Sequence, residues 1–322
     1  MVVASRCREI VPSACLRDAT LPSVDDLLHI LQELRQKRSK EKNTQRFLAH
    51  LRYVHLSICE LGLDGHSDLC NYLVPIFFDN GFFLEAIQIF HKTPRRNEYA
   101  WTSLIESWYV DFFDVHETFK MYEHMKKDDV LPSKCTLLAL LRACRQSLFM
   151  MGGLFIHHEV VSNNIEEDSF LASSLVHMYS KCGLLFEAQT VFDKLHIRDV
   201  VTWNALMVGY AELGYPDEVL NCLNNMKEGG VFGDAITFLS CLKACSNIGI
   251  IEKGLYVHLE LVTEGYETDA FIRSTLVGMY AKLGLLKEAQ ELLDELPICD
   301  VISWTSLIMG YADHGLGEQA LI

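Results

Sequence analysis

The chain has 322 residues, half of them hydrophobic and 22% charged, with a formal net charge of −15. This composition is that of a globular protein with enough apolar residues for a large core. The sequence contains no apolar run of 18 residues, so it predicts no membrane span.

The charge is unevenly distributed along the chain. Residues 1–66 hold ten Lys and Arg against eight Asp and Glu, and the remaining residues hold 18 against 35. Nucleic-acid-binding proteins usually carry a basic surface, so this balance argues against an RNA or DNA role. The objection loses force for a curved repeat protein whose acidic residues lie on the convex face and leave the groove neutral or basic.

The first 23 residues, "MVVASRCREIVPSACLRDATLPS", contain three Arg, a few Ser and two acidic residues. This pattern weakly indicates an organellar transit segment, and a disordered start is the alternative. The Arg content favours a mitochondrial location over a chloroplast one. Residues 24–66 follow as a degenerate repeat, interrupted by the basic insert "RQKRSKEK" at 35–42.

The rest of the chain repeats itself. "MYSKCGLLFEAQTVFDKLHIRDVVTWNALMVGYAELG" begins at Met178, and "MYAKLGLLKEAQELLDELPICDVISWTSLIMGYADHG" begins 101 residues later, at Met279, and aligns without a gap. That interval is composed of units of 35, 35 and 31 residues, each ending in Asp. In chain order the predicted units are 24–66, 67–97, 98–133, 134–168, 169–199, 200–234, 235–269, 270–300 and the incomplete 301–322.

Within a unit the apolar spacing is helical. In 200–234, five residues are predicted on one side of a first helix: Val201, Ala205, Leu206, Val208 and Gly209. Gly214 and Pro216 should end that helix, and a second helix is expected from Glu218 to Met226, before Gly229 and Gly230. Such helix–turn–helix units bury their apolar faces only by stacking into an array with a continuous core.

Recurring large and small residues at helical spacing, among them Trp203, Tyr210, Gly214 and Ala289, are expected to serve packing. The chain has eleven Cys, several of them inside apolar helical stretches such as "LRAC" (141–144) and "LKAC" (242–245). We expect these to be buried thiols of a protein in a reducing compartment.

The stretch "VVTWNALMVGYAELG…MKEGGVFGD" resembles the pentatricopeptide repeat, and "MYSKCGLLFEAQTVFDKLHIRD" resembles its short variant. The alternation of lengths is similar to the P, L and S triplet of plant PLS-class pentatricopeptide proteins. The resemblance covers about residues 24–322 and implies an all-α, right-handed superhelical solenoid. In the triplet scheme, 67–97, 169–199 and 270–300 are S units, 98–133, 200–234 and 301–322 are P units, and 134–168 and 235–269 are L units, as is the degenerate 24–66.

The family resemblance implies binding of single-stranded RNA in an organelle, one nucleotide per repeat. It assigns base choice to the fifth and last residues of a unit. The base-reading candidates are Asn71 with Asn97, Thr102 with Ser133, Ser173 with Asp199, Asn204 with Asp234, Ser274 with Asp300, and Thr305 in the incomplete unit. Leu138 and Leu239 of the L units make no polar contact, so those units should discriminate little.

The second residue of a unit is expected to stack on the base. The candidates are Tyr99, Phe170, Val201, Ile236, Phe271 and Ile302, whereas Asp68 and Cys135 depart from the pattern. The family's pairings imply the base order Y-R-N-G-U-N-G-R, with U at Asn204/Asp234 and G at Ser173/Asp199. The alternative for each fifth residue is an ordinary exposed helix residue, and for each terminal Asp the N-cap of the next helix.

We find no sign of catalysis. A zinc deaminase needs H-x-E with C-x-x-C; "HLE" (258–260) matches the first half, but no C-x-x-C exists, and the same His recurs as His157 and His55. No phosphate loop, catalytic triad or metal-ligand spacing is present, so we expect no cofactor, no metal and no enzymatic activity of its own. The chain stops within a repeat, so we expect a truncated product or a partial gene.

The leading interpretation is a sequence-specific binder of single-stranded organellar RNA that supports RNA editing or other processing, with editing-factor proteins supplying catalysis in trans. The alternative is a protein-interaction scaffold of the tetratricopeptide kind, which would suit the acidic charge. Tetratricopeptide arrays have a uniform 34-residue period, and the alternating lengths found here argue against one.

Overall fold

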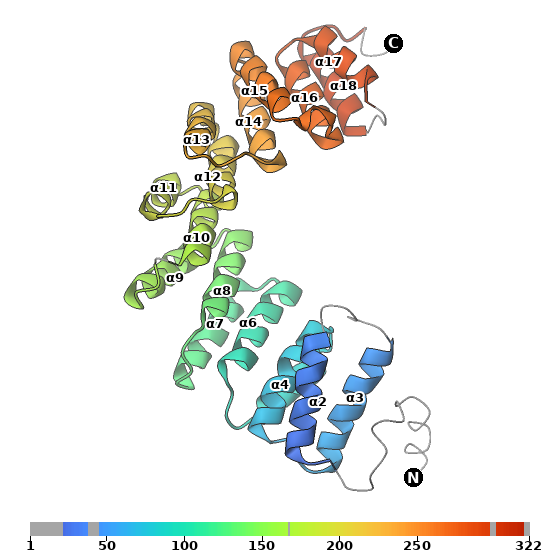
Figure 1. Cartoon of the computed structure of the whole chain (residues 1–322), viewed down its shortest axis with the longest axis vertical. Helices are drawn as coiled ribbons and strands as arrows, with labels where there is room; N and C mark the ends of the chain where they lie inside the picture. The colour runs from blue at the N-terminus through green and yellow to red at the C-terminus, as the bar shows by residue number, and fades with distance from the viewer. Residues whose placement is uncertain (1–21, 38–44, 167, 297–300, 319–322) are drawn as a thin grey trace. The chain divides into compact units, whose positions relative to one another are not determined.

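The computed structural model describes residues 22–37, 45–166, 168–296 and 301–318. Within these ranges the regular structure consists of α-helices and one short 3-10 helix, with no strand (Figure 1). The all-α prediction is therefore confirmed. Asp300, most of the basic insert and nearly all of the expected transit segment lie outside the described residues.

The helices follow one another through short connections. In chain order they are α2 (Val24–Lys37), α3 (Gln45–Glu60), α4 (Ser67–Asp79), α5 (Phe83–Lys92), α6 (Glu98–Phe112), α7 (Val115–Lys127), α8 (Lys134–Ser147), α9 (Met150–Ser162), α10 (Ser169–Lys181), α11 (Leu185–Lys194), α12 (Val200–Leu213), α13 (Pro216–Glu228), α14 (Ala235–Ile248), α15 (Ile251–Thr263), η1 (Tyr266–Thr268), α16 (Ala270–Lys282), α17 (Leu286–Asp294) and α18 (Val301–Asp313). Two α-helices fall within each predicted unit from 67–97 to 270–300, and α18 falls within the incomplete last one.

The chain forms two compact units, one up to Ala143 and one from Cys144. In the first, α4 packs against its partner α5 and against α6, the first helix of the next pair. In the second, α10 packs in the same way on α11 and α12, and α16 packs on α14, α17 and α18. Within each of the two compact units, the first helix of one repeat therefore packs on the first helix of the next repeat. A helical repeat array builds its core in this way.

In 200–234 the first helix ends where the sequence predicts, whereas the second is longer than the predicted Glu218–Met226, running from Pro216 to Glu228. Gly214 follows the last residue of α12 with φ 79°, a left-handed conformation that glycine adopts without steric cost. Pro216 is the first residue of α13, a position where its missing N–H is not needed. Gly229 follows the last residue, Glu228.

The buried stripe of α12 is centred differently from the prediction. Thr202, Leu206 and Gly209, spaced i, i+4 and i+7, are buried. Val201 lies in the first turn at the flank of this stripe and is 62% exposed, so its placement on the core side was wrong. Trp203 is buried as expected, its ring centroid 4.5 Å from that of Phe192.

The cysteines of the described residues are free thiols. Cys144 and Cys245, in the two quoted motifs, are buried as predicted, and burial raises their thiol pKa values to about 12 and about 11. Cys59 and Cys135 are exposed, so the expectation of burial does not hold for them. None of the helices in the described ranges is long and apolar enough to cross a membrane.

Candidate nucleic-acid interface

The six predicted stacking residues all lie on the surface. They occupy the first turn of a first helix, and their exposure ranges from 51% for Tyr99 to 68% for Phe170; the others are Val201, Ile236, Phe271 and Ile302. Large apolar side chains are more often buried, so their repeated exposure at one position marks a surface able to contact a flat apolar partner such as a base. Asp68 and Cys135 are also exposed at this position.

Asn204 and Asp234 are brought together although 30 residues separate them. Asp234 is the N-cap of α14, and its Oδ1 accepts from the backbone N–H of Thr237 at 3.0 Å. The same oxygen accepts from Asn204 Nδ2 at 2.8 Å, while Asn204 Oδ1 accepts from the Thr237 hydroxyl at 2.6 Å. Asn204 is only 5% exposed, so it is not an ordinary surface residue.

Ser173 and Asp199 are joined through a third side chain. Asp199 caps α12 by accepting from the Thr202 backbone N–H at 2.9 Å, and it also accepts from the Thr202 hydroxyl at 2.5 Å. Ser173 Oγ lies 2.6 Å from Thr202 Oγ1. The two predicted readers are therefore connected through Thr202, which is 1% exposed.

The same geometry recurs between α6 and α8, with Ser in place of Asp. Thr102 Oγ1 lies 2.6 Å from Thr136 Oγ1, and Ser133 Oγ lies 3.1 Å from that same hydroxyl. Thr136 is fully buried. Thr102 and Ser133 are thus linked through a buried hydroxyl, as Ser173 and Asp199 are.

Asn71 and Asn97 meet in a different way. Asn71 Nδ2 donates to the carbonyl of Arg95 at 3.0 Å, and Asn71 Oδ1 accepts from the backbone N–H of Asn97 at 3.1 Å. The Asn97 side chain turns to cap α6 by accepting from the Ala100 backbone N–H. The amide of Asn71 is therefore held by backbone, and the two side chains do not form a pair like Asn204 and Asp234.

The last predicted positions are less complete. Ser274 is buried and its Oγ accepts from the Ser303 hydroxyl at 2.7 Å, but its predicted partner Asp300 lies outside the described residues. Thr305 is exposed and donates to the Val301 carbonyl within its own helix. In the predicted L units, Asp168 and Asp269 cap α10 and α16. In the described part of the chain, each Asp that ends a repeat unit is therefore the N-cap of the next helix.

Sequence reasoning missed one residue of each network, the third residue of the following unit. It is Thr or Ser where the networks form, at Thr136, Thr202, Thr237 and Ser303. The other units from 67 onward carry a hydrophobic residue there. The predicted unit boundaries already define the third position, so the recurrence of Thr or Ser there could have been recognised in the sequence.

A groove of about 400 Å³ lies along the first helices α14, α16 and α18. Among its lining residues are the predicted stacking residues Phe271 and Ile302 and the predicted reader Ser274. Lys243 and Lys282 also line it. Asp313 lines it as well, so the groove carries charges of both signs. Apolar side chains together with lysines suit the binding of unpaired bases and their phosphates.

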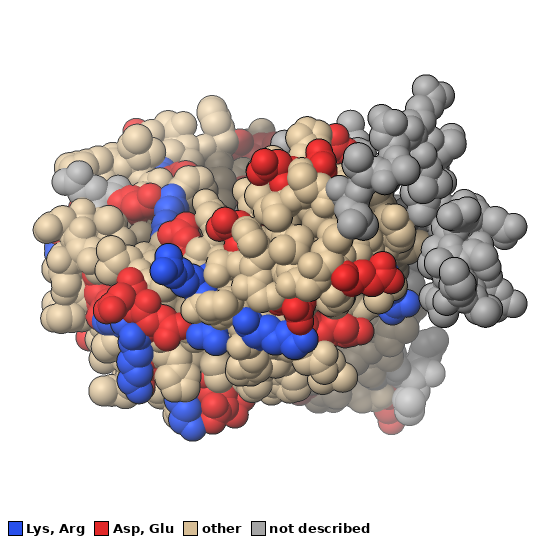
Figure 2. All heavy atoms as spheres, turned by 90° about the horizontal axis from the view of Figure 1, so that it is seen from below, with Lys and Arg blue, Asp and Glu red and all other residues tan. Residues whose placement is uncertain are grey.

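Farther along the first helices, basic side chains lie next to acidic or histidine side chains of the neighbouring first helix. Lys181 Nζ lies 2.5 Å from Glu212 Oε1, and Lys243 Nζ lies 3.9 Å from the same oxygen. Arg145 contacts His177 at 2.8 Å, and burial together with this guanidinium lowers the pKa of His177 to about 4. The face in Figure 2 likewise shows acidic and basic side chains interspersed, without a large area of one sign.

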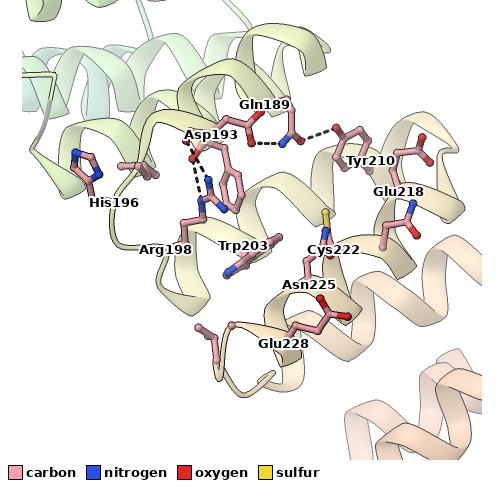
Figure 3. A pocket seen from close by; sticks show the side chains of 15 residues that line it. Gln189, Asp193, His196, Arg198, Trp203, Tyr210, Glu218, Cys222, Asn225 and Glu228 are labelled. Atoms are coloured by element: carbon pink, nitrogen blue, oxygen red, sulfur yellow. Dashed lines mark hydrogen bonds between the residues drawn. The ribbon is translucent and has the colours of Figure 1, made fainter.

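A second, larger cavity of about 800 Å³ lies among α11, α12 and α13. Figure 3 shows its polar lining, in which Tyr210 donates to Gln189 Oε1 at 3.0 Å and Gln189 donates to Asp193 Oδ1 at 2.7 Å. Arg198 is occupied by the backbone carbonyls of Phe192 and Asp193. This cavity contains none of the predicted reading or stacking residues.

The recurring histidines belong to the scaffold. His157 Nδ1 lies 2.7 Å from the hydroxyl of Tyr179, and His258 Nδ1 lies 2.6 Å from that of Tyr280. His55 packs edge-on against Phe77. In the part of the chain that the structure describes, no group of three or more His, Cys, Asp or Glu could hold a metal ion.

Stacked helix pairs with a regular row of exposed apolar and buried polar side chains define a helical-repeat protein. The PPR repeat family matches residues 198–247, and the PPR repeat matches residues 171–200, 271–301 and 302–322. The chain belongs to the pentatricopeptide repeat family.

Its relatives include three pentatricopeptide repeat-containing proteins of Arabidopsis thaliana. One is 35% identical over 83% of this chain and 39% of its own length. A chloroplastic one is 32% identical over 88% of this chain and 46% of its own, and a mitochondrial one is 30% identical over 86% and 43%. The chain thus spans less than half the length of these curated relatives.

Solved structures show the same fold. The crystal structure of the pentatricopeptide repeat protein PPR10 in complex with an 18-nt psaJ RNA element matches with a TM-score of 0.69, at 16% identity, over 99% of this chain and 51% of that chain. PPR10 from maize matches with a TM-score of 0.58, at 16% identity, over 99% of this chain and 54% of that chain.

Proposed function

We propose that the protein binds single-stranded RNA in a sequence-specific manner, one nucleotide per repeat. The groove along α14, α16 and α18 carries this proposal, because its lining combines the exposed apolar side chains of Phe271 and Ile302 with the predicted reader Ser274 and two lysines. PPR10, which has the same fold, is solved in complex with an RNA element. Phe170, Val201 and Ile236 are exposed at the same repeat position as Phe271 and Ile302, within the same compact unit.

Base choice is proposed to lie with the fifth and last residues of each unit, in the P, L and S arrangement of the PLS class. Asn204 with Asp234 would read U, and Ser173 with Asp199 would read G. The N-caps at Asp199 and Asp234 use Oδ1, and the second oxygen of each carboxylate has no hydrogen bond among the described residues. Capping and base reading are therefore compatible roles for one Asp.

The RNA is proposed to be organellar, and the protein to support editing or other transcript processing without catalysis of its own. The relatives include chloroplastic and mitochondrial proteins, which suits an organelle, and we favour the mitochondrion. Editing-factor proteins would supply catalysis in trans. The outer helices α9 and α15 expose apolar side chains such as Phe155 and Leu259, on which a protein partner could dock.

These same apolar side chains, with the acidic charge, favour the second candidate, a protein-interaction scaffold. RNA crosslinking in the organelle, with sequencing of the bound fragments, separates the two. We expect enrichment of fragments with G-U-N-G at their centre. Recovery of no RNA above a crosslinking control would favour the scaffold.

A sharper test changes one reader. Asn204→Thr should move the preference at one nucleotide from U to G and leave its neighbours unchanged, because Thr offers a hydroxyl where Asn offers an amide. Binding to RNA oligomers that differ at that nucleotide measures this. An equal loss for all four bases, or no change, would show that Asn204 is not a reader.

A further inference from the structure

The buried hydroxyl at the third position of a unit lies between the two predicted readers of the unit before it. Thr202 and Thr237 are 1% and 0% exposed, so neither side chain can touch an RNA base. Each nevertheless bonds to both readers: Thr202 to Ser173 and Asp199, and Thr237 to Asn204 and Asp234. Thr136 makes the corresponding pair of contacts with Thr102 and Ser133.

A hydroxyl has a single proton, so its direction fixes what its neighbour can offer. The carboxylate of Asp199 only accepts, so the Thr202 hydroxyl directs its proton to Asp199 Oδ1 in a hydrogen bond of 2.5 Å. Ser173 must then donate its own proton to Thr202 Oγ1. Ser173 is left with lone pairs, so this unit presents only acceptors to a base. Guanine offers N1–H and N2–H donors on its pairing edge, which suits an all-acceptor reader.

The third residue of the next unit, Thr237, leaves a different set of hydrogen-bonding groups at Asn204. Thr237 Oγ1 lies 2.6 Å from Asn204 Oδ1 and 3.1 Å from Asp234 Oδ1, so its single proton is directed to the nearer amide oxygen, while Asp234 Oδ1 accepts from Asn204 Nδ2. The amide is therefore held in one orientation, with its second N–H unbonded among the described residues. Together with the second oxygen of Asp234, it offers one donor and one acceptor. Uracil complements these with a carbonyl oxygen and N3–H.

We infer that Thr136, Thr202 and Thr237 are positioning residues for base choice, each fixing which hydrogen-bonding groups the preceding unit turns toward the RNA. This inference rests on the proposed RNA-binding function. Without the Thr237 hydroxyl, the buried Oδ1 of Asn204 would lose its donor, and the amide would no longer be held in a single position. The choice of base should weaken while stacking on the second residues persists.

The test compares Thr237→Val, which removes the hydroxyl and keeps the shape, with Thr237→Ser, which keeps the hydroxyl. Thr190→Val is the matched control, because Thr190 is exposed on α11 and bonds only within its own helix. The probes are four RNA oligomers, 5′-CAAGXAGA-3′, with each base at X. A parallel set varies the preceding G, which Ser173 should read. Thermal unfolding followed by circular dichroism reports the folding of each variant.

We expect the wild type, Thr237→Ser and Thr190→Val to prefer U at X. Thr237→Val should lose about tenfold of that preference, within the range that a side-chain contact to a base provides, and should keep its preference for the preceding G. A folded Thr237→Val that still prefers U overturns this inference and leaves the proposed base reading intact. A wild type without preference at X overturns the proposed base reading and this inference with it.

Thr237 also takes part in the N-cap of α14, so Thr202→Val provides an independent variant. It should weaken the preference for G at the preceding position and leave U at X unchanged. Retention of the G preference in folded Thr202→Val would contradict the inference even if Thr237→Val failed to fold.

Discussion

Gly209 lies where α12 packs on α10. A Cβ at this position would stand 2.6 Å from Ser180 Cβ and 3.1 Å from the Ser180 backbone, so the two helices could not stay as close. We expect Gly209→Ala to destabilise the fold by about 1–3 kcal/mol, although Ala is the better helix former. The midpoint of denaturant unfolding measures this.

Gly278 of α16 is the matched control for that substitution. A Cβ there would meet Ser306 Oγ at 3.5 Å, an ordinary contact. Gly278→Ala should therefore be neutral or stabilising by up to about 1 kcal/mol through helix propensity. Equal shifts in the same direction for the two variants would show that the contact with Ser180 does not restrict α12.

The candidate readers could be predicted from the sequence because the unit lengths set a register, and Asn204 and Asp234 occupy equivalent places in it. Their burial could not be predicted in the same way. It depends on how the first turn of α14 meets α12, a contact between residues 33 apart such as Thr237 and Asn204. The sequence therefore indicated the fifth and last residues of each unit as candidate readers. The third residue of the following unit, which contacts them, was missed.

Helix pairs are tied to their neighbours by a recurring hydrogen bond between His and Tyr. His157 of α9 meets Tyr179 of α10, and His258 of α15 meets Tyr280 of α16. Burial raises the pKa of Tyr179 to about 12 and lowers that of His157, so a neutral phenol meets a neutral imidazole. The bond therefore stabilises the stacking of one pair on the next without a charge.

We expect Tyr179→Phe and Tyr280→Phe each to lower the free energy of unfolding by about 0.5–1.5 kcal/mol, because a half-buried imidazole nitrogen loses its partner. Tyr256→Phe is the control, since its hydroxyl bonds to Asn224 at the surface and water can replace it. Calorimetry of the three variants provides the comparison. A loss in Tyr256→Phe as large as in the other two would argue against a special role of the His–Tyr bond.

The helices themselves were well predicted, because Gly214 and Pro216 act through local backbone geometry. The division of the chain into two compact units between Ala143 and Cys144 was not predicted. It falls inside α8, and the repeat spacing is the same on both sides of it. Local signals fix where a helix ends. They carry no information on which stacked pairs form one compact unit, because that depends on contacts summed over several helices.

For the molecule as a whole, four half-buried histidines make the stability depend on pH. Burial lowers the pKa values of His55, His157, His177 and His258 below the usual 6.5. The unfolded chain therefore binds more protons than the folded one as the pH falls through 6.5, so stability is present above that pH and decreases below it. Three of the four residues belong to the compact unit that starts at Cys144.

We expect the thermal midpoint to fall progressively from pH 7.5 to pH 5, and His177→Gln to reduce that decrease. Gln can still accept from Arg145 but does not titrate. The effect of His177 should be about 1 kcal/mol at pH 5, smaller than full linkage would give because the imidazole keeps part of its contact with water. A midpoint that stays constant or rises on acidification would show that these half-buried histidines are protonated in the folded protein.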